Sequence, residues 1–301
     1  MIRDFDDFSL WVYFIVDEIW QQLGPHFRRP GPAPRCSDSE LIAMSLIGEC
    51  RGWDQETDLL SAWREHRDLF PHQPSQSRFN RRRRQLATGF NWLRRALVQS
   101  LELARESYCL IDSLPLPVVQ FHYAPQASRE WAVAGATFGK VPSKKATIYG
   151  FKLHLLTTVE GLILDFELAP ANIADIEVGF EMLAEHTDLD VLGDKAYVGA
   201  AKRAELRTDC RVNLRALPRR NQRPQPSRAY QQYFNARRQV IETVNSQLAE
   251  QFNIERNHAH TFWGLCTRLH TKLTAHTLSI YLNRRLDNPP YLQIKKLAFP
   301  N

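Results

Sequence analysis

The spacing of the apolar residues changes near Tyr108, and this change divides the chain into two parts. Upstream of Tyr108, apolar residues recur at the spacing of one helix face, as they do from Phe79 to Leu101. Downstream come short, mostly apolar runs such as 108–113, which are typical of buried strands. A chain that mixes strands and helices in this way is expected to fold as an α/β protein, with helices covering the faces of a mixed sheet.

The elements expected after residue 108 define one domain. The predicted strands cover residues 108–113, 147–158, 162–168, 190–193 and 211–214. The predicted helices cover residues 177–186, 199–207, 230–252 and 263–283. Glu160-Gly161 is expected to turn a hairpin between two of the strands. We therefore divide the chain into a helical region at 1–104, an α/β domain at 105–285 and a C-terminal tail at 286–301.

The first hundred residues are predicted to be helical. The expected helices cover residues 5–22, 38–50, 56–66 and 77–101. The second of them begins after a capping box formed by Ser37 and Glu40. A connector at 24–35, with four prolines and two glycines, separates it from the first helix.

A cluster of five arginines lies between Arg78 and Arg84, at the start of the last of these helices. Ser77, Asn80, Arg81 and Arg84 lie opposite the apolar face and form a basic ridge. With the short helices before it, this segment resembles a helix-turn-helix element, in which the start of the second helix enters the major groove of DNA. Arg81 and Arg84 are the best candidates for base or phosphate contacts, and Asn80 is a candidate for adenine. The alternative is a solvated helix face, the usual role of a charge run.

Charge and composition restrict the class of protein. Across 301 residues, 39 Lys and Arg face 33 Asp and Glu, and the pI near 9.1 favours polyanionic partners. Five cysteines lie apart without CxxC spacing, which argues against a disulfide framework or a zinc module. The apolar run at 10–16 is far shorter than a membrane span, and aspartates precede it where a signal peptide carries positive charge. We expect a soluble cytoplasmic protein without a membrane partner.

Three carboxylates stand out by their placement. Asp112 and Asp194 each close a short apolar strand, where a carboxylate is costly unless it is paired, hydrogen-bonded or metal-bound. Glu242 lies at the edge of the apolar face of a predicted helix, one turn after Arg238. If the strands are neighbours and the helix packs over their ends, the three acids converge into an oxygen ligand set that suits two Mg²⁺ or Mn²⁺ ions. Each acid taken singly also fits an ordinary structural role.

Four motifs carry a resemblance to a known family. They are Ile111-Asp112-Ser113-Leu114-Pro115-Leu116-Pro117, Tyr149-Gly150-Phe151-Lys152-Leu153-His154, Gly193-Asp194-Lys195-Ala196-Tyr197 and the run from Arg238 to Leu248. In this order and at these separations they resemble the Asp-Asp-Glu transposases of bacterial insertion sequences. With the stretch from Phe252 to Gly264, the chain is similar more narrowly to the insertion-sequence 982 family.

This resemblance implies a fold, a chemistry and a set of partners. It implies a ribonuclease-H-like sheet with Asp112 and Asp194 on adjacent strands, Glu242 on the closing helix, and all three as catalytic residues that hold two Mg²⁺ or Mn²⁺ ions. It also implies double-stranded DNA as partner, both terminal repeats and target, and a homodimer or larger synaptic assembly at a bacterial nucleoid. Many relatives carry a lysine or arginine seven residues after the glutamate, where this chain has Ala249. Arg238 or Lys195 would then make those phosphate contacts.

The predicted DNA contacts extend beyond the arginine cluster. The full set is Arg78, Asn80, Arg81, Arg84, Lys195, Arg219, Arg220 and Arg238. Arg219 and Arg220 belong to a proline-broken loop at 218–227, and counterion release would make their contacts salt-dependent. A flexible surface loop is the alternative there. His154 is expected on a sheet face, and Trp131 and Trp263 fit burial better than stacking on a base.

Three functions are compatible with these features. The first is a transposase that cuts insertion-sequence ends and joins them to target DNA by two-metal-ion phosphoryl transfer. The second is a plain ribonuclease-H-like nuclease, which cuts without joining. The third is a catalytically silent regulator that descends from a transposase and only binds DNA, and the intact set of three acids argues against it.

Overall fold

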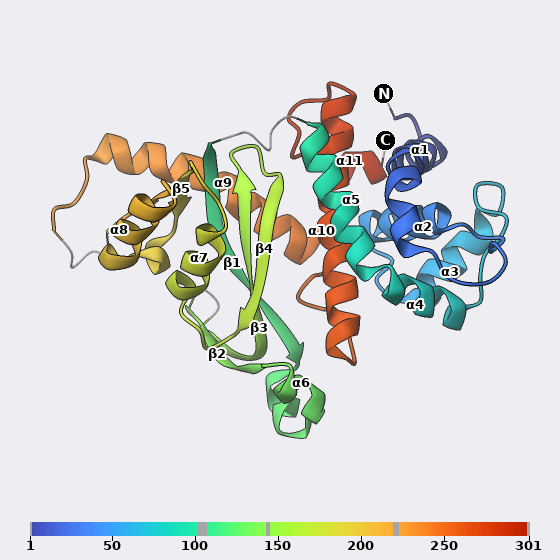
Figure 1. Cartoon of the computed structure of the whole chain (residues 1–301), viewed down its shortest axis with the longest axis horizontal. Coiled ribbons are helices and arrows are strands. Elements are labelled where there is room, and N and C mark those ends of the chain that lie inside the picture. The colour runs from blue at the N-terminus through green and yellow to red at the C-terminus, as the bar shows by residue number, and fades with distance from the viewer. Residues whose placement is uncertain (1, 102–106, 143–144, 219–222, 300–301) are drawn as a thin grey trace. The chain divides into compact units, whose positions relative to one another are not determined.

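The computed structural model describes residues 2–101, 107–142, 145–218 and 223–299, which form two compact units (Figure 1). The helical unit contains the residues up to 101 together with those from 247 onward, and the sheet unit contains residues 102–246. These limits differ from the domain limits expected at 104 and 285. The reason is that the helix at 262–285 packs with the N-terminal helices.

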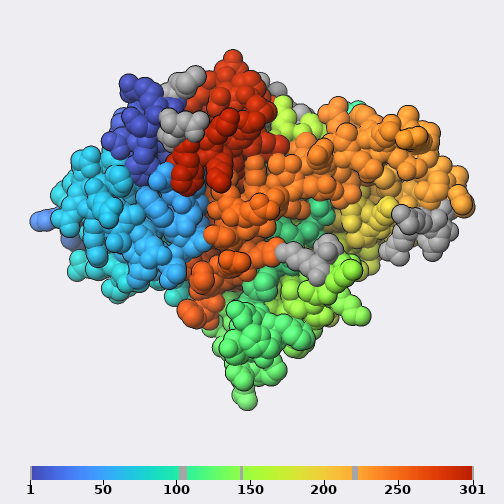
Figure 2. Space-filling model, turned by 180° about the vertical axis from the view of Figure 1, so that it is seen from behind, coloured from blue at the N-terminus to red at the C-terminus, as the bar shows by residue number. Residues whose placement is uncertain are grey.

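The helical unit brings together the two ends of the sequence. Its N-terminal part contains α1 (Phe5–Leu23), η1 (Gly24–Phe27), α2 (Asp38–Arg51), α3 (Glu56–Glu65), α4 (Gln76–Gln85) and α5 (Ala87–Ser100). Its C-terminal part contains the end of α9 (Arg228–Glu250), then α10 (Phe262–Arg285) and α11 (Lys295–Ala298). α10 packs against α5 and α2, and α11 packs against α1 and α2. Figure 2 shows the last residues, in red, beside the first helices, in blue.

The helices begin largely where the sequence predicts. Ser37 Oγ accepts a hydrogen bond from Glu40 N at 3.1 Å, and Glu40 Oε2 accepts one from Ser37 N at 2.6 Å, which completes the expected capping box. The pattern from Ser77 to Leu101 predicts one helix, but the chain turns at Leu86 and forms α4 and α5. The apolar face stays buried on both sides of this turn, so periodicity alone does not reveal it.

α10 is buried around most of its circumference although many of its residues are polar. Thr267, Thr271, Thr274 and Thr277 each donate a hydrogen bond to the carbonyl four residues earlier, at 2.7–2.9 Å. Their hydroxyl groups are therefore satisfied within the helix and can be buried at little cost. No helix in the described part of the chain is long and apolar enough to cross a lipid bilayer.

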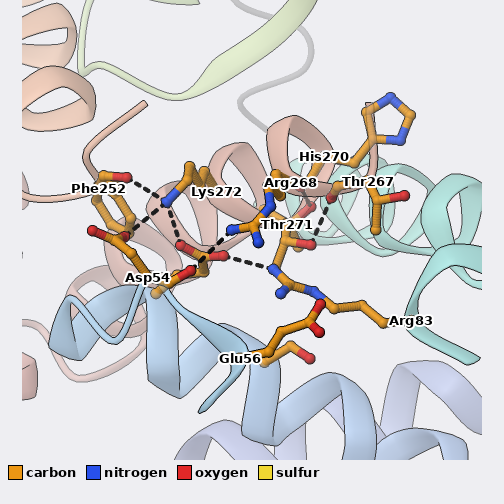
Figure 3. A network of polar contacts seen from close by, with 12 residues as sticks. Asp54, Glu56, Arg83, Phe252, Thr267, Arg268, His270, Thr271 and Lys272 are labelled. Atoms are coloured by element: carbon orange, nitrogen blue, oxygen red, sulfur yellow. Dashed lines mark hydrogen bonds and ion pairs between the residues drawn. The ribbon is translucent and has the colours of Figure 1, made fainter. Parts of the chain in front are cut away.

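A buried ionic network joins α10 to α2 and α4 (Figure 3). The ammonium of Lys272 donates to Glu49 Oε2 at 2.6 Å, to Asp54 Oδ1 at 3.1 Å and to the carbonyl of Phe252 at 2.6 Å. All three of its hydrogens are thus used. Arg83 Nη2 donates to the other oxygen of Glu49 at 2.7 Å. Through the carbonyl of Phe252, the network also holds the chain just after α9 within the helical unit.

The sheet unit is a mixed α/β structure. Its elements are β1 (Tyr108–Val119), η3 (Phe121–Gln126), α6 (Arg129–Val133), β2 (Thr137–Val141), β3 (Ala146–Thr158), β4 (Ile163–Pro170), α7 (Asp175–Ala184), β5 (Asp190–Gly193), η5 (Lys195–Tyr197), α8 (Ala200–Asp209), β6 (Asn213–Ala216) and the first part of α9. The strand order is β2-β3-β1-β5-β6, and β4 also pairs with β3. β1, β3 and β4 pair antiparallel, whereas β5 and β6 run parallel to β1.

Helices α7 and α8 cover one face of this sheet. Ile111, Val191 and Leu214 project from three neighbouring strands into a core with Met182 of α7 and Leu206 of α8. The mixed sheet with flanking helices, and the helical region before it, agree with the sequence prediction. This core fixes the relative positions of β1, which contains Asp112, and β5, which Asp194 directly follows.

The structure corrects three details of the sheet. β1 does not end near Asp112 but continues to Val119, and beyond Ile111 its pairing is with β3 alone. Pro115 and Pro117 fit such an edge, where the missing N–H is not needed. β2, η3 and α6 lie where no element was expected, and β6 begins two residues later than predicted. Gly139 in β2 is required by close packing, because a Cβ there would lie 2.2 Å from the carbonyl oxygen of Ala171.

Candidate active site

β1 and β5 place two aspartates side by side. The strands are parallel neighbours in which Ile111 pairs with Gly193, so Asp112, the next residue of β1, lies beside Asp194, which directly follows β5. Asp194 caps η5, because its Oδ1 accepts a hydrogen bond from Ala196 N at 2.6 Å. The structure therefore brings together two acids that lie far apart in the sequence.

α9 carries the third acid and contacts Asp112 directly. Asn245 Nδ2 donates to Asp112 Oδ2 at 3.1 Å, and Arg238 Nη2 lies 3.9 Å from the same oxygen. Arg238 Nη2 also lies 3.4 Å from Glu242 Oε1, one helical turn away. Glu242 is thus on the face of α9 that meets Asp112, and its side chain is about half exposed, whereas that of Asp112 is mostly covered.

The electrostatics of Asp112 reflect this crowding of acids. Burial raises the pKa of Asp112 to about 7, against the opposing effects of the hydrogen bond from Ser113 N and of the charge of Arg238. The carboxylates of Asp194 and Glu242 raise the pKa of Asp112 further. Asp112 is therefore a covered carboxyl group for which another positive charge nearby would be favourable.

A second polar group, His154, lies on the sheet as expected, but its partners were not predicted from the sequence. His154 of β3 is fully buried, and its Nδ1 lies 3.2 Å from the hydroxyl of Tyr197. Its Nε2 lies 3.9 Å from Asp175 Oδ1, and Asp175 also pairs with Lys152. Burial lowers the pKa of His154 to about 4, so its imidazole is neutral at pH 7. Only the partners of His154, which depend on tertiary structure, distinguish it from an ordinary residue of a sheet face.

The three acids supply suitable donors for a metal ion but do not form a closed ligand set as they stand. Among the described residues, no three carboxylate, histidine or cysteine side chains are close enough together to hold a metal ion. Arg238 instead supplies the positive charge beside Asp112 and Glu242. The donor chemistry still fits a hard divalent cation, because all three ligands offer carboxylate oxygen. The buried amide oxygen of Asn245, next to Asp112, also accepts no hydrogen bond.

The part of the chain that carries this arrangement matches a known family. Residues 105–261, more than half of the chain, match the family described as the transposase DDE domain. The chain belongs to this family of transposase DDE domains. Comparisons with curated proteins and with solved structures give no match. All three acids of the transposase lie inside the matched segment.

The residues predicted to contact DNA lie at several places in the transposase. Arg78 and Arg81 are exposed on α4, and Lys195 is exposed in η5. Arg84 is partly exposed, and its carbonyl accepts a hydrogen bond from Trp263 Nε1 at 3.1 Å. The amide nitrogen of Asn80 donates to both carboxylate oxygens of Glu56 at 2.7 Å. Arg238 lies between two acids, Asp112 and Glu242. Arg219 and Arg220 fall outside the described residues.

Two of the five clustered arginines are not on the surface of the transposase. Arg82 is buried and pairs with Asp38, and Arg83 is buried and pairs with Glu49. The basic ridge on α4 is therefore narrower than the run of arginines suggests. Helical spacing indicates that these two arginines are buried, because positions 82 and 83 follow Phe79 by three and four residues and so lie on the apolar side of the helix.

Proposed function

We propose that this protein is a DNA transposase that cuts the ends of an insertion sequence and joins them to target DNA. The observation that carries the proposal is the meeting of Asp112 with the face of α9 that bears Glu242, beside Asp194 on the neighbouring strand. The match of this segment to the transposase DDE domain supports the same reading. Neither a repressor nor a structural DNA-binding protein needs three acids in this arrangement.

The fold and the motifs support a more specific assignment. The mixed sheet, with two acids from neighbouring strands and the third on α9, is consistent with a ribonuclease-H-like catalytic core. The resemblance of the motifs extends this to the insertion-sequence 982 family. Because the described part of the segment between Asp194 and Glu242 holds η5, α8, β6, a loop and the start of α9, it has little room for an additional domain before the glutamate.

Asp112, Asp194 and Glu242 would hold two Mg²⁺ or Mn²⁺ ions, which when bound supply charge stabilisation for phosphoryl transfer. Asp112 lies within β1 and Asp194 directly follows β5, so the sheet would hold both carboxylates, and the cations bound to them, in fixed positions for the scissile phosphate. Glu242 is about half exposed on α9, and its side chain can turn away from Arg238 toward the aspartates. Arg238, released from Glu242, is then placed to contact a phosphate oxygen.

The proposed reaction has two steps. Water attacks a phosphodiester at the end of the element, the bond to the 3′ oxygen breaks, and a 3′-hydroxyl is released. This hydroxyl then attacks a phosphodiester of the target. A bond forms between the 3′ oxygen of the element and the target phosphorus, and the bond from that phosphorus to the 3′ oxygen of the target strand breaks. Two ends must be processed together, which requires a homodimer or a larger assembly on double-stranded DNA.

The proposal is tested by incubating the protein with a labelled duplex that carries the end of its element, a target plasmid and Mg²⁺. We expect cleavage at the end and joined products, both lost in Asp194→Asn and in EDTA. The loss for Asp194→Asn should exceed about 10²-fold, because the substitution removes electrostatic stabilisation of the transition state. Lys296→Ala, an exposed residue of α11, is the matched control and should leave both products unchanged. Cleavage without joining would identify a nuclease, and DNA binding without products would identify a regulator.

A further inference from the structure

A cationic groove of about 780 Å³ runs beside α4 in the helical unit. One wall is formed by residues 28–36, here called the proline connector, and the other by α4 with the loop before it. Five arginines and one histidine line the groove, and the described lining contains no aspartate or glutamate. Such a lining favours a polyanion, because its charged side chains are all arginines.

The arginines at the rim of the groove have no partners of their own. Arg29 and Arg35 lie on the proline connector, and Arg78 and Arg81 lie on α4. All four are exposed, and none makes a hydrogen bond or ion pair with any residue that the structure describes. Two separate segments of the chain thus present unneutralised guanidinium groups to one space.

The fifth arginine holds these two segments together. Arg82 of α4 is buried, and its Nη2 donates to the carbonyl of Phe27 at 2.7 Å, just before the proline connector. Its Nε donates to Asp38 Oδ1 at 2.7 Å, just after the connector. One guanidinium therefore fastens both ends of the connector to α4, in a fork geometry that only arginine provides. The three prolines between them, Pro30, Pro32 and Pro34, limit the conformations of the connector itself.

We propose that the proline connector is a second DNA-contacting wall, in which Arg29 and Arg35 bind phosphates of a DNA duplex that lies along α4. This inference rests on the DNA binding in the proposed function. It adds a DNA-contacting surface that lies outside the helix-turn-helix-like element. Arg78 and Arg81 contact the duplex from α4, whereas the connector contacts the phosphate backbone beside it. Backbone contacts of this kind position a protein on DNA without selecting a sequence.

The test measures the salt dependence of binding. The full chain is titrated against a fluorescein-labelled duplex of arbitrary sequence at several salt concentrations, and anisotropy gives the binding constant. Each phosphate contact contributes about 0.9 to the slope of log K against log salt concentration, so R29A/R35A should reduce the slope by about 1.8. R29K/R35K keeps both charges and should keep the slope.

The matched control is R64A/R67A, which removes two exposed arginines of the same unit that do not line the groove. It has the same change in net charge and should leave the slope nearly unaltered. A slope for R29A/R35A equal to that of the unaltered chain, or equal losses in the two double variants, would overturn the inference about the connector alone. Absence of duplex binding by the unaltered chain would overturn both the connector wall and the DNA binding of the proposed function.

Discussion

At the scale of single residues, the energetics of the site are dominated by the covered carboxyl group of Asp112. Ionisation of this group is opposed by burial and by two neighbouring acids, and it is favoured by Arg238 and by the hydrogen bond from Ser113. The folded protein therefore keeps a proton on Asp112 at acidities where the unfolded chain has released it. This difference links the stability of the protein to pH.

The contribution of Asp112 to the free energy of unfolding should fall as the pH rises. Because the pKa of Asp112 is raised from 3.8 to about 7, its favourable contribution is complete below about pH 4 and is lost as the pH rises through 7. Asp112→Asn cannot ionise, so at pH 8 without metal it should be more stable than the unaltered protein by about 2–4 kcal/mol. Urea unfolding at pH 4 and pH 8 measures this, and a gain of equal size at both values would contradict it.

The sequence indicated some of the site residues, and the physical reason is clear for each. Asp112 and Asp194 are visible because an acid after an apolar run is an exception that needs compensation. The roles of Arg82 and Arg83 were not visible, because their acidic partners lie tens of residues away and only packing brings them together. His154 lies on the sheet as expected, but its contact with Tyr197 was not predicted for the same reason, since that contact joins β3 to η5.

At the scale of elements, α10 is the helix whose role differs most from expectation. Helical periodicity predicted its limits to within two residues, but not its neighbours. A helix that is buried around its circumference has no single apolar stripe that would point to one partner. Polar residues of α10 contact both neighbours: Lys272 donates to Glu49 of α2, and Thr274 donates to the carbonyl of Phe90 in α5.

Lys272→Met should therefore destabilise the helical unit strongly. The substitution leaves the carboxylates of Glu49 and Asp54 without their shared cation, and breaking such a buried pair costs about 3–5 kcal/mol. Urea unfolding with Lys296→Met as control measures the effect, and the control should stay within about 0.5 kcal/mol of the unaltered protein because Lys296 is exposed. Equal stability of the two variants would show that the network in Figure 3 contributes little.

At the scale of the whole molecule, the helical unit is built from two segments that the sheet unit separates in sequence. The change of hydrophobic period near Tyr108 correctly indicated where strands begin. No comparable change marks residue 247, because α9 runs through that position as one continuous helix. Sequence patterns report local structure, so they located the helices and not the return of the chain to its first unit.

A chain that ends after Phe252 tests this organisation. It lacks α10, which packs against α2 and α5, so the helical unit should lose its cooperative unfolding and, with it, the DNA binding proposed above. A chain that ends after Asn288 lacks α11 but keeps α10, and it should unfold cooperatively at a lower urea concentration. Tryptophan fluorescence during urea unfolding distinguishes the two, and a cooperative transition in the helical unit of the shorter chain would contradict the prediction.

The discontinuous helical unit also sets an order of events on the ribosome. The sheet unit is complete once residue 246 has been translated, whereas the helical unit waits for α10. A nascent chain thus folds the unit that carries the three acids before it can complete the unit that contains the basic groove. Under the function proposed above, translated chains that end before α10 would not bind the DNA ends of the element. Only chains that include α10 would bind them.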